Sequence, residues 1–335
     1  MEATQNKFST KSITKLMSNN SITVLLILLA LFVAITQDNF MSKSNFVNLV
    51  ANTSVRFVIA LGVSGCLITK GTDLSAGRIA GLGACIASLL LQRPDYASRF
   101  WPNMPEMSVP FVLLITLAIC AVFGVINGCV ISFLKVPPFI ATLGMQTVVY
   151  GICLLLTGAQ PIGGLKESYT TIANGSWFNK WVPYLLVIAA IVGAYMYFLY
   201  NKTRHGKYMY AIGGNENAAE VAGVNCNKTK ILIYTLAACL YALGGFLMAA
   251  KTGGASVNTG QGYELEAIAA CTIGGVSTNG GVGRVSGILI GVLVFETLKI
   301  CLQFLGVEPS YTYIIQGLVI IVAVALDLRK YLAKK

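Results

Sequence analysis

Long apolar segments recur along the whole chain, and they constrain its fold more than any other feature. Several reach the roughly 17–25 residues that a helix needs to cross a bilayer, among them 109–134, 181–200 and 285–305. Helices satisfy their own backbone hydrogen bonds in lipid, and the alternating strands of about ten residues that build an outer-membrane barrel do not occur. The composition, 56% hydrophobic and 11% charged, excludes an ordinary soluble domain. We therefore predict an all-α, polytopic integral membrane protein.

The positive charges indicate which parts of the chain face the cytoplasm. The net charge of +11 is concentrated before the first apolar segment, in the polar stretch 201–230 and at the C-terminus. Cytoplasmic loops of membrane proteins carry such an excess of Lys and Arg, so the charge reflects topology and not nucleic-acid binding. The loops near 92–108 and 158–180 carry few cations for their length, and they contain or border the three tryptophans, as expected on the opposite side.

About ten transmembrane helices are expected, and an even number places both termini in the cytoplasm. Residues 1–20 form an N-terminal tail, residues 21–328 a single transmembrane domain with a cytoplasmic loop at 201–230, and residues 329–335 a basic tail. Residues 38–53 are expected to lie along the outer interface of the membrane. The expected helices cover residues 21–37, 54–70, 75–91, 109–134, 138–157, 181–200, 230–250, 263–277, 281–305 and 311–328.

The residue types that catalysis or metal binding would need are scarce. Eight of the nine cysteines lie in apolar segments and no pair lies in the predicted exterior, so we expect no disulfide. His205 is the only histidine, and no GxxxxGK[ST] phosphate loop occurs. The sequence therefore argues against an enzyme and against a cofactor or metal site in this chain.

Two glycine-rich stretches of similar composition interrupt the apolar segments. "TKGTDLSAGRIAGLGA" covers 69–84 and "IGGVSTNGGVGRVSGILIG" covers 273–291. Glycines at four-residue spacing let helix backbones approach closely, and paired interruptions of this kind point to a transport path. Asp73 either caps the helix that follows it or lines that path, and both interpretations stay open.

Four charged residues occupy apolar segments near the end of the chain. Glu296 and Lys299 are three residues apart on one helical face and are expected to neutralise each other. Glu264 and Glu266 are two residues apart, so they should point to different sides of a helix, and one of them is expected at the start of that helix. This spacing argues against a paired acid/base site.

The stretch 201–230 contains signals for a short helix. Asn215 suits an N-cap, alanines follow it, and Gly223 suits a left-handed stop. A helix of about two turns is marginal on its own in water. Its small apolar face therefore predicts docking into a groove of a partner protein. A solvated loop with a nascent turn is the alternative.

Five ordered motifs give the chain a family resemblance. They are "GTDLSAGR" (71–78), "VPPFIATLG" (136–144), "TRHGKYMYAIGGNENAAEVAGV" (203–224), "YELEAIAACTIGGVSTNGGVG" (263–283) and "VALDLRKY" (324–331). Over about residues 20–330 the chain resembles the permease subunits of bacterial ABC sugar importers of the ribose/galactose class, and within that class the galactose/methyl-galactoside branch.

The resemblance implies an assembly in the bacterial inner membrane. Two permease subunits would form the path, a periplasmic sugar-binding protein would deliver the sugar, and cytoplasmic ATPase domains, typically two halves of one double-length protein, would bind ATP and Mg. The permease itself would carry no cofactor. Its loop would seat in the ATPase, with Gly213, Gly214 and Asn215 as a hinge and cap and not as a phosphate cradle. The residues implied in ATPase coupling are Thr203, Gly206, Gly213, Gly214, Asn215, Ala218, Ala219 and Gly223.

We expect the cargo to be a neutral hexose, namely galactose, a methyl-galactoside or glucose. The candidate residues along its path are Asp73, Ser75, Asn127, Thr142, Ser277 and Asn279. A permease for ribose or another sugar of the same class is the first alternative. A secondary carrier driven by an ion gradient is the second, although the docking loop and the lack of paired intramembrane acids argue against it. A membrane-bound enzyme is the third.

Overall fold

The computed structural model describes residues 21–332 of the 335-residue chain, and the side chains of residues 24–325. The expected tail at 1–20 lies outside the described residues, whereas the last helix continues to Leu332 and so includes the start of the expected tail at 329–335. In chain order the helices are α2 (Ser21–Thr36), α3 (Lys43–Ile68), α4 (Ala76–Leu90), α5 (Val109–Phe133), α6 (Pro138–Thr157), α7 (Glu167–Asn174), α8 (Tyr184–Lys202), α9 (Arg204–Gly214), α10 (Glu216–Val221), α11 (Cys226–Thr252), α12 (Tyr263–Ile273), α13 (Val285–Phe304) and α14 (Pro309–Leu332).

The helix lengths confirm a polytopic, all-α membrane protein. Six helices in the described part of the chain are long and apolar enough to cross a bilayer, namely α3, α5, α6, α8, α11 and α13, and α2, α4 and α14 contain shorter apolar segments. The expected crossing at 263–277 corresponds to α12, which has 11 residues and so spans only about 16 Å. It reaches across a membrane only together with the non-helical segments on either side.

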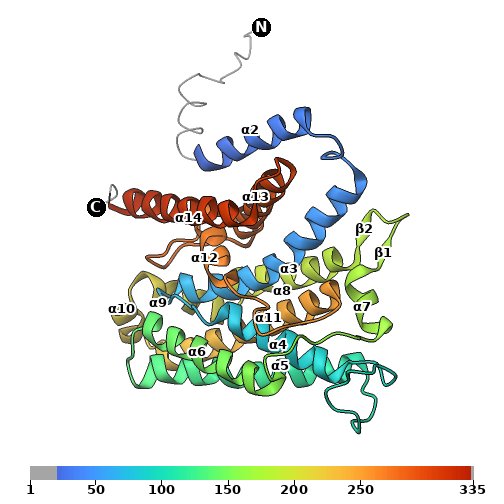
Figure 1. The fold of residues 1–335 in the computed structure, drawn as a ribbon. Helices are drawn as coiled ribbons and strands as arrows, with labels where there is room; N and C mark the ends of the chain where they lie inside the picture. The colour runs from blue at the N-terminus through green and yellow to red at the C-terminus, as the bar shows by residue number, and fades with distance from the viewer. Residues whose placement is uncertain (1–20, 333–335) are drawn as a thin grey trace.

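Contacts between loops identify the two ends of the structure. At one end Ile162 and Ala255 form an antiparallel bridge, as do Gln92 and Leu165. The strands β1 (Ser176–Trp177) and β2 (Val182–Pro183) lie at this end with α7, opposite α9, α10 and the end of α14 (Figure 1). The loops therefore alternate between the ends as ten crossings require, with the tryptophans opposite the 201–230 loop.

α11 forms the centre of the core and packs against α3, α4 and α5. Glycines make this packing possible: a Cβ at Gly124 or Gly128 of α5 would overlap the backbone or side chains of α11. In the same way Gly291 of α13 lies against the carbonyl of Ala270 on α12. These contacts confirm that the glycines at four-residue spacing serve close packing between helices.

The helix that was expected to begin at residue 54 begins at Lys43, within the stretch 38–53. Residues from Lys43 onward belong to α3, a single 26-residue helix that Ser42 begins by accepting a hydrogen bond from the amide of Asn45. Such a helix is about 39 Å long, which exceeds the roughly 30 Å hydrocarbon thickness. The polar residues after Lys43 therefore extend a spanning helix and do not form a separate surface helix.

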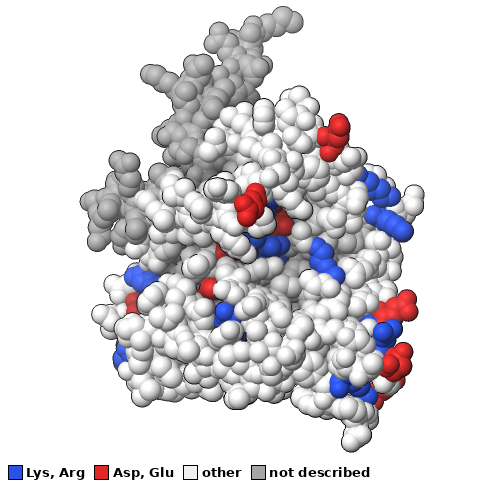
Figure 2. Space-filling model, viewed as in Figure 1, with Lys and Arg blue, Asp and Glu red and all other residues white. Residues whose placement is uncertain are grey.

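The surface is mostly uncharged, as expected of a protein surrounded by lipid. Figure 2 shows charged side chains along the edge of this face where α7 and β1–β2 lie, and a smaller group in a central hollow. All nine cysteines are free, which agrees with the expectation of no disulfide.

Candidate coupling and transport site

The polar stretch 201–230 folds into two short helices with defined ends. Thr203 begins α9 by accepting a hydrogen bond from the amide of Gly206 at 3.1 Å, and Asn215 begins α10 by accepting one from the amide of Ala218 at 3.1 Å. Gly223 ends α10 with a φ of 86°, a left-handed conformation that glycine adopts without steric cost. The predicted N-cap and stop are therefore confirmed.

α10 presents a small apolar tip to the outside. Val221 is 91% exposed, and Ala218 and Ala222 are exposed beside it. Ala219 lies on the inner side, where it packs in a small cluster with Ile212 and Cys226. Lipid does not account for the exposure of Val221, because the residue lies beyond the spanning helices. The exposed apolar face of α10 is thus Ala218, Val221 and Ala222, while Ala219 packs inward.

Ionic and packing contacts fix α9 and α10 to the spanning helices. The Lys230 ammonium on α11 lies 2.7 Å from both carboxylate oxygens of Glu216. Gly206 fits against the carbonyls of Leu199 and Tyr200 with no room for a Cβ. His205 is half-buried, and burial lowers the pKa of its imidazole, so this side chain is neutral at pH 7. The loop is a packed unit and not a free linker.

The two neighbouring glycines of the loop differ. A Cβ at Gly213 would overlap the carbonyl oxygen of Ile68 at the end of α3, whereas a Cβ at Gly214 would meet open space. Both residues belong to α9. Gly213 is therefore a point of contact with the transmembrane domain, and both glycines form the end of α9, directly before the Asn215 cap of α10.

Four of the six candidate path residues form one hydrogen-bonded cluster. Ser75 donates to Asp73 Oδ1 at 2.6 Å, and the Asn127 side-chain amide of α5 donates to Ser75 at 3.0 Å. Thr142 of α6 accepts a hydrogen bond from the amide of Leu74 at 3.0 Å. All four side chains are at most 1% exposed. The cluster thus joins the break between α3 and α4 to α5 and α6.

Asp73 is buried and hydrogen-bonded at the start of α4. Its carboxylate accepts the amide of Ser75, directly before α4, at 2.9 Å, and the hydroxyl of Tyr241 at 3.2 Å. These bonds favour capping, because they leave the carboxylate facing protein. Ser277 and Asn279 lie apart from the cluster, in the break before α13, and the Asn279 side-chain nitrogen is buried without a hydrogen-bond partner in the described part of the chain.

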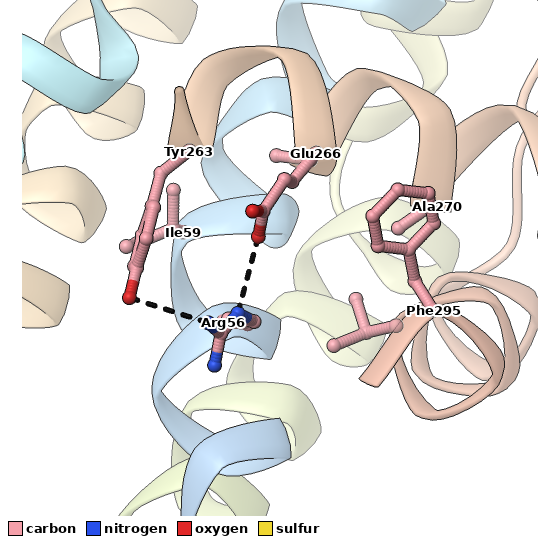
Figure 3. A pocket seen from close by; sticks show the side chains of 8 residues that line it. Arg56, Ile59, Tyr263, Glu266, Ala270 and Phe295 are labelled. Atoms are coloured by element: carbon pink, nitrogen blue, oxygen red, sulfur yellow. Dashed lines mark hydrogen bonds and ion pairs between the residues drawn. The ribbon is translucent and has the colours of Figure 1, made fainter. Parts of the chain in front are cut away.

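A second polar site, which sequence reasoning missed, lies between α3, α12 and α13. The Arg56 guanidinium contacts Glu266 at 3.2 Å, Glu296 at 2.9 Å and the hydroxyl of Tyr263 at 3.3 Å. Lys299 bonds to the other oxygen of Glu266. Figure 3 shows Arg56 pointing toward Glu266 and Tyr263 in a small pocket closed by Ile59, Ala270 and Phe295. The sequence signal that could have revealed this site is Arg56 itself, an arginine inside an apolar segment.

This site corrects one expectation about the charged residues and confirms another. Glu296 and Lys299 do not neutralise each other: Arg56 pairs with Glu296, and Lys299 pairs with Glu266. The reason is that a neighbouring helix supplies a guanidinium within reach of both carboxylates. Glu264 points away from Glu266 and lies against Gly77 of α4, and both glutamates are in the first turn of α12. They do not form an acid pair.

Comparisons with known proteins agree with this architecture. A family model described as "Branched-chain amino acid transport system / permease component" matches residues 45–324. The galactose/methyl galactoside import permease of Escherichia coli (strain K12) is 48% identical over 318 residues, covering 93% of this chain and 94% of that protein. The galactose/methyl galactoside import permease of Haemophilus influenzae is 45% identical over 331 residues, which cover 97% of this chain and 98% of that protein. The ribose import permease of Bacillus subtilis is 36% identical and covers 91% of each. No solved structure matches.

Proposed function

Because the chain belongs to the family of transport-system permease components, we propose that it is the membrane-spanning subunit of an ATP-driven hexose importer in the bacterial inner membrane. Galactose and methyl galactoside are the proposed cargo, since the relatives at 45–48% identity carry these sugars in their names and the ribose permease is 36% identical. Translocation of a neutral sugar needs no covalent chemistry, so the chain is a permease and not an enzyme.

The observation that carries the proposal is the packed loop with an exposed apolar tip. A valine that is 91% exposed in water is a candidate anchor for a groove in another protein. Thr203, Gly206, Asn215, Ala219 and Gly223 shape the loop from within. Ala218, Val221 and Ala222 are then the groups that contact the ATPase.

The assembly we propose has three partners besides lipid. A second copy of this chain completes the path, and a periplasmic binding protein meets the outer end, where the tryptophans lie. A cytoplasmic ATPase, of double length in this class, receives the loop and binds ATP and Mg. Specificity for one hexose then depends chiefly on the binding protein.

The hydrogen-bonded cluster around Asp73 is the proposed inner closure of the path. In the described conformation Asp73, Ser75 and Asn127 bond to one another, and Thr142 bonds to the backbone of the same break. Opening the path here therefore separates this break from α5 and α6. Ser277 and Asn279, in the second break, are proposed to meet sugar hydroxyls, since the Asn279 amide has an unused donor.

Uptake by a reconstituted complex tests the proposal. Proteoliposomes that hold the permease and its ATPase, supplied with the cognate binding protein, are expected to accumulate labelled galactose only with internal ATP. An excess of unlabelled methyl galactoside should suppress the uptake, and ribose should not. Suppression by ribose alone would assign the chain to the alternative sugar. Uptake without ATP under a proton or sodium gradient would indicate a secondary carrier.

A further inference from the structure

The proposed coupling loop, residues 201–230, touches both glycine-rich breaks of the transmembrane domain where the two breaks meet. The backbone amide of Gly281, in the second break, donates to the carbonyl of Ile68, at the start of the first, at 2.8 Å. Gly213 of α9 lies against both: its hypothetical Cβ would overlap the Ile68 carbonyl and crowd the amide of Gly281. We call this three-way contact of Ile68, Gly213 and Gly281 the backbone junction.

Neighbouring side chains tie the same three segments together. The Tyr210 hydroxyl of α9 donates to the carbonyl of Gly283 at 2.9 Å, and the Lys70 ammonium donates to the carbonyl of Gly214 at 3.4 Å. Gly280 has its φ at 82° and no room for a Cβ beneath the Lys70 side chain and the Gly213 carbonyl. The contact is therefore continuous from α9 into each break.

The backbone junction transmits movement because it is formed by closely packed backbone atoms. Side chains at an interface absorb small movements by changing rotamer, whereas close-packed backbones do not compress. A displacement of α9 must accordingly move Ile68 and Gly281. These residues precede α4 and α13, the helices that follow the two breaks. A rigid displacement of α9 thus moves the segments before α4 and α13 at the same time.

We propose that Gly213 is a positioning residue for transport, which transmits the movement of the docked loop to both breaks through the backbone junction. This inference rests on the proposed function, because it needs an ATPase that moves the loop. It goes beyond docking: the tip residues Ala218, Val221 and Ala222 bind the motor, while Gly213, on the opposite side of the loop, transfers the displacement.

The chain offers a matched control for the test. Gly213 lies in α9 and Gly151 in α6, neither has a positive φ, and only Gly213 lacks space for a Cβ. Gly213→Ala and Gly151→Ala therefore make the same chemical change in a helix with different consequences. The readouts are binding of the ATPase to the purified permease and, in proteoliposomes, galactose molecules imported per ATP hydrolysed.

We expect Gly213→Ala to bind the ATPase as the unaltered permease does and to lower the import ratio at least about tenfold, or about 1.4 kcal/mol. Gly151→Ala should stay within about twofold. An unchanged ratio in Gly213→Ala overturns the inference, as does a parallel fall of uptake and ATP hydrolysis, which indicates a structural role alone. Loss of ATPase binding also overturns it, because Gly213 would then belong to the docking face.

Tyr210→Phe keeps the test decisive if Gly213→Ala does not assemble. It removes the hydroxyl bonded to Gly283 and adds no atoms, so it should fold and lower the import ratio about threefold. A ratio equal to that of the unaltered permease in this variant would contradict the inference. Failure of the unaltered permease to bind any ATPase would instead contradict the proposed function, so the two failures are distinguishable.

Discussion

At the residue scale, the loop at 201–230 contains pairs of nearby residues of similar type that lie in different environments. Asn215 caps α10, while Asn217, two residues later, lies within the helix. Gly213 is in contact with Ile68 while Gly214 is open. Ala219 is 5% exposed while Val221 is 91% exposed. Such pairs allow the contribution of a single contact to be measured against a control of the same residue type.

Removal of the Asn215 cap should loosen α10. Asn215→Ala leaves the amide of Ala218 without its acceptor, and loss of an N-cap costs about 1 kcal/mol. Hydrogen exchange measured by mass spectrometry should then show faster exchange over 216–221. Asn217→Ala is the control and should change exchange little. Equal acceleration in both variants would mean that the cap is not what holds the helix.

His205 should make the packing of α9 sensitive to mild acid. Burial lowers its pKa in the folded loop, whereas an exposed histidine titrates near about 6.5. The unfolded loop therefore binds more protons below that pH, and stability falls as the pH drops through about 6.5 toward the lower folded pKa. Exchange of residues 204–214, corrected for intrinsic rates, should accelerate between pH 7.5 and 5.5. His205→Gln should abolish that change, and a profile that is flat in the unaltered protein would contradict the account.

At the element scale, the transmembrane helices are held by glycine contacts and by one buried group of charges. α5 meets α11 through Gly124 and Gly128, while Arg56, Glu266, Glu296 and Lys299 connect α3, α12 and α13. Neither type of contact relies on hydrophobicity, which does not drive helices together inside lipid.

A larger residue at the α5–α11 contact should destabilise the fold. Gly124→Val places its side chain against Tyr234 and Ala238, and overpacking of this kind costs about 1–3 kcal/mol. The apparent melting temperature in detergent should fall. Gly144→Val on α6 is the matched control, because a Cβ there meets nothing within 4 Å. If Gly144→Val lowers the melting temperature as much as Gly124→Val does, helix propensity and not packing explains the loss of stability.

Removal of Arg56 should be more damaging than removal of the charges around it. Arg56→Met removes the ion-pair partner of Glu296, which is 3% exposed, and breaking a buried pair typically costs about 3–5 kcal/mol. The double variant Arg56→Met/Glu296→Gln should recover part of the stability, since no uncompensated charge is then buried. If the double variant has a lower melting temperature than Arg56→Met, the loss of charge pairing does not explain the destabilisation.

Some of these elements were predictable from the sequence, and others depended on contacts between distant residues. The spans followed from apolar length, and the ends of α10 followed from Asn215 and Gly223, because both signals are local. The start of α3 was missed, since polar residues extend the helix beyond the apolar segment. The partner of Glu296 was also missed, because Arg56 lies 240 positions earlier in the sequence and only the fold brings it near.

At the scale of the whole molecule, the parts of the candidate site follow one another through the structure. The exposed tip of α10 is at one end of the structure (Figure 1), α9 connects it to the backbone junction, and the breaks lead to the cluster around Asp73. Sequence motifs identified the loop and both breaks separately. Their direct contact could not be foreseen, because hydrogen bonds between backbone atoms such as those of Ile68 and Gly281 leave no signature in residue type.

Site-specific photo-crosslinking at Val221 tests the central claim most directly. A photoreactive residue at position 221 of the assembled importer should yield an adduct with the ATPase subunit, because docking buries this side chain. The same residue at position 178, where Phe178 is 77% exposed at the opposite end, should yield none. Crosslinking to the ATPase at 221 but not at 178 is the predicted result. An ATPase that binds and drives uptake, yet forms no adduct at 221, would contradict the account.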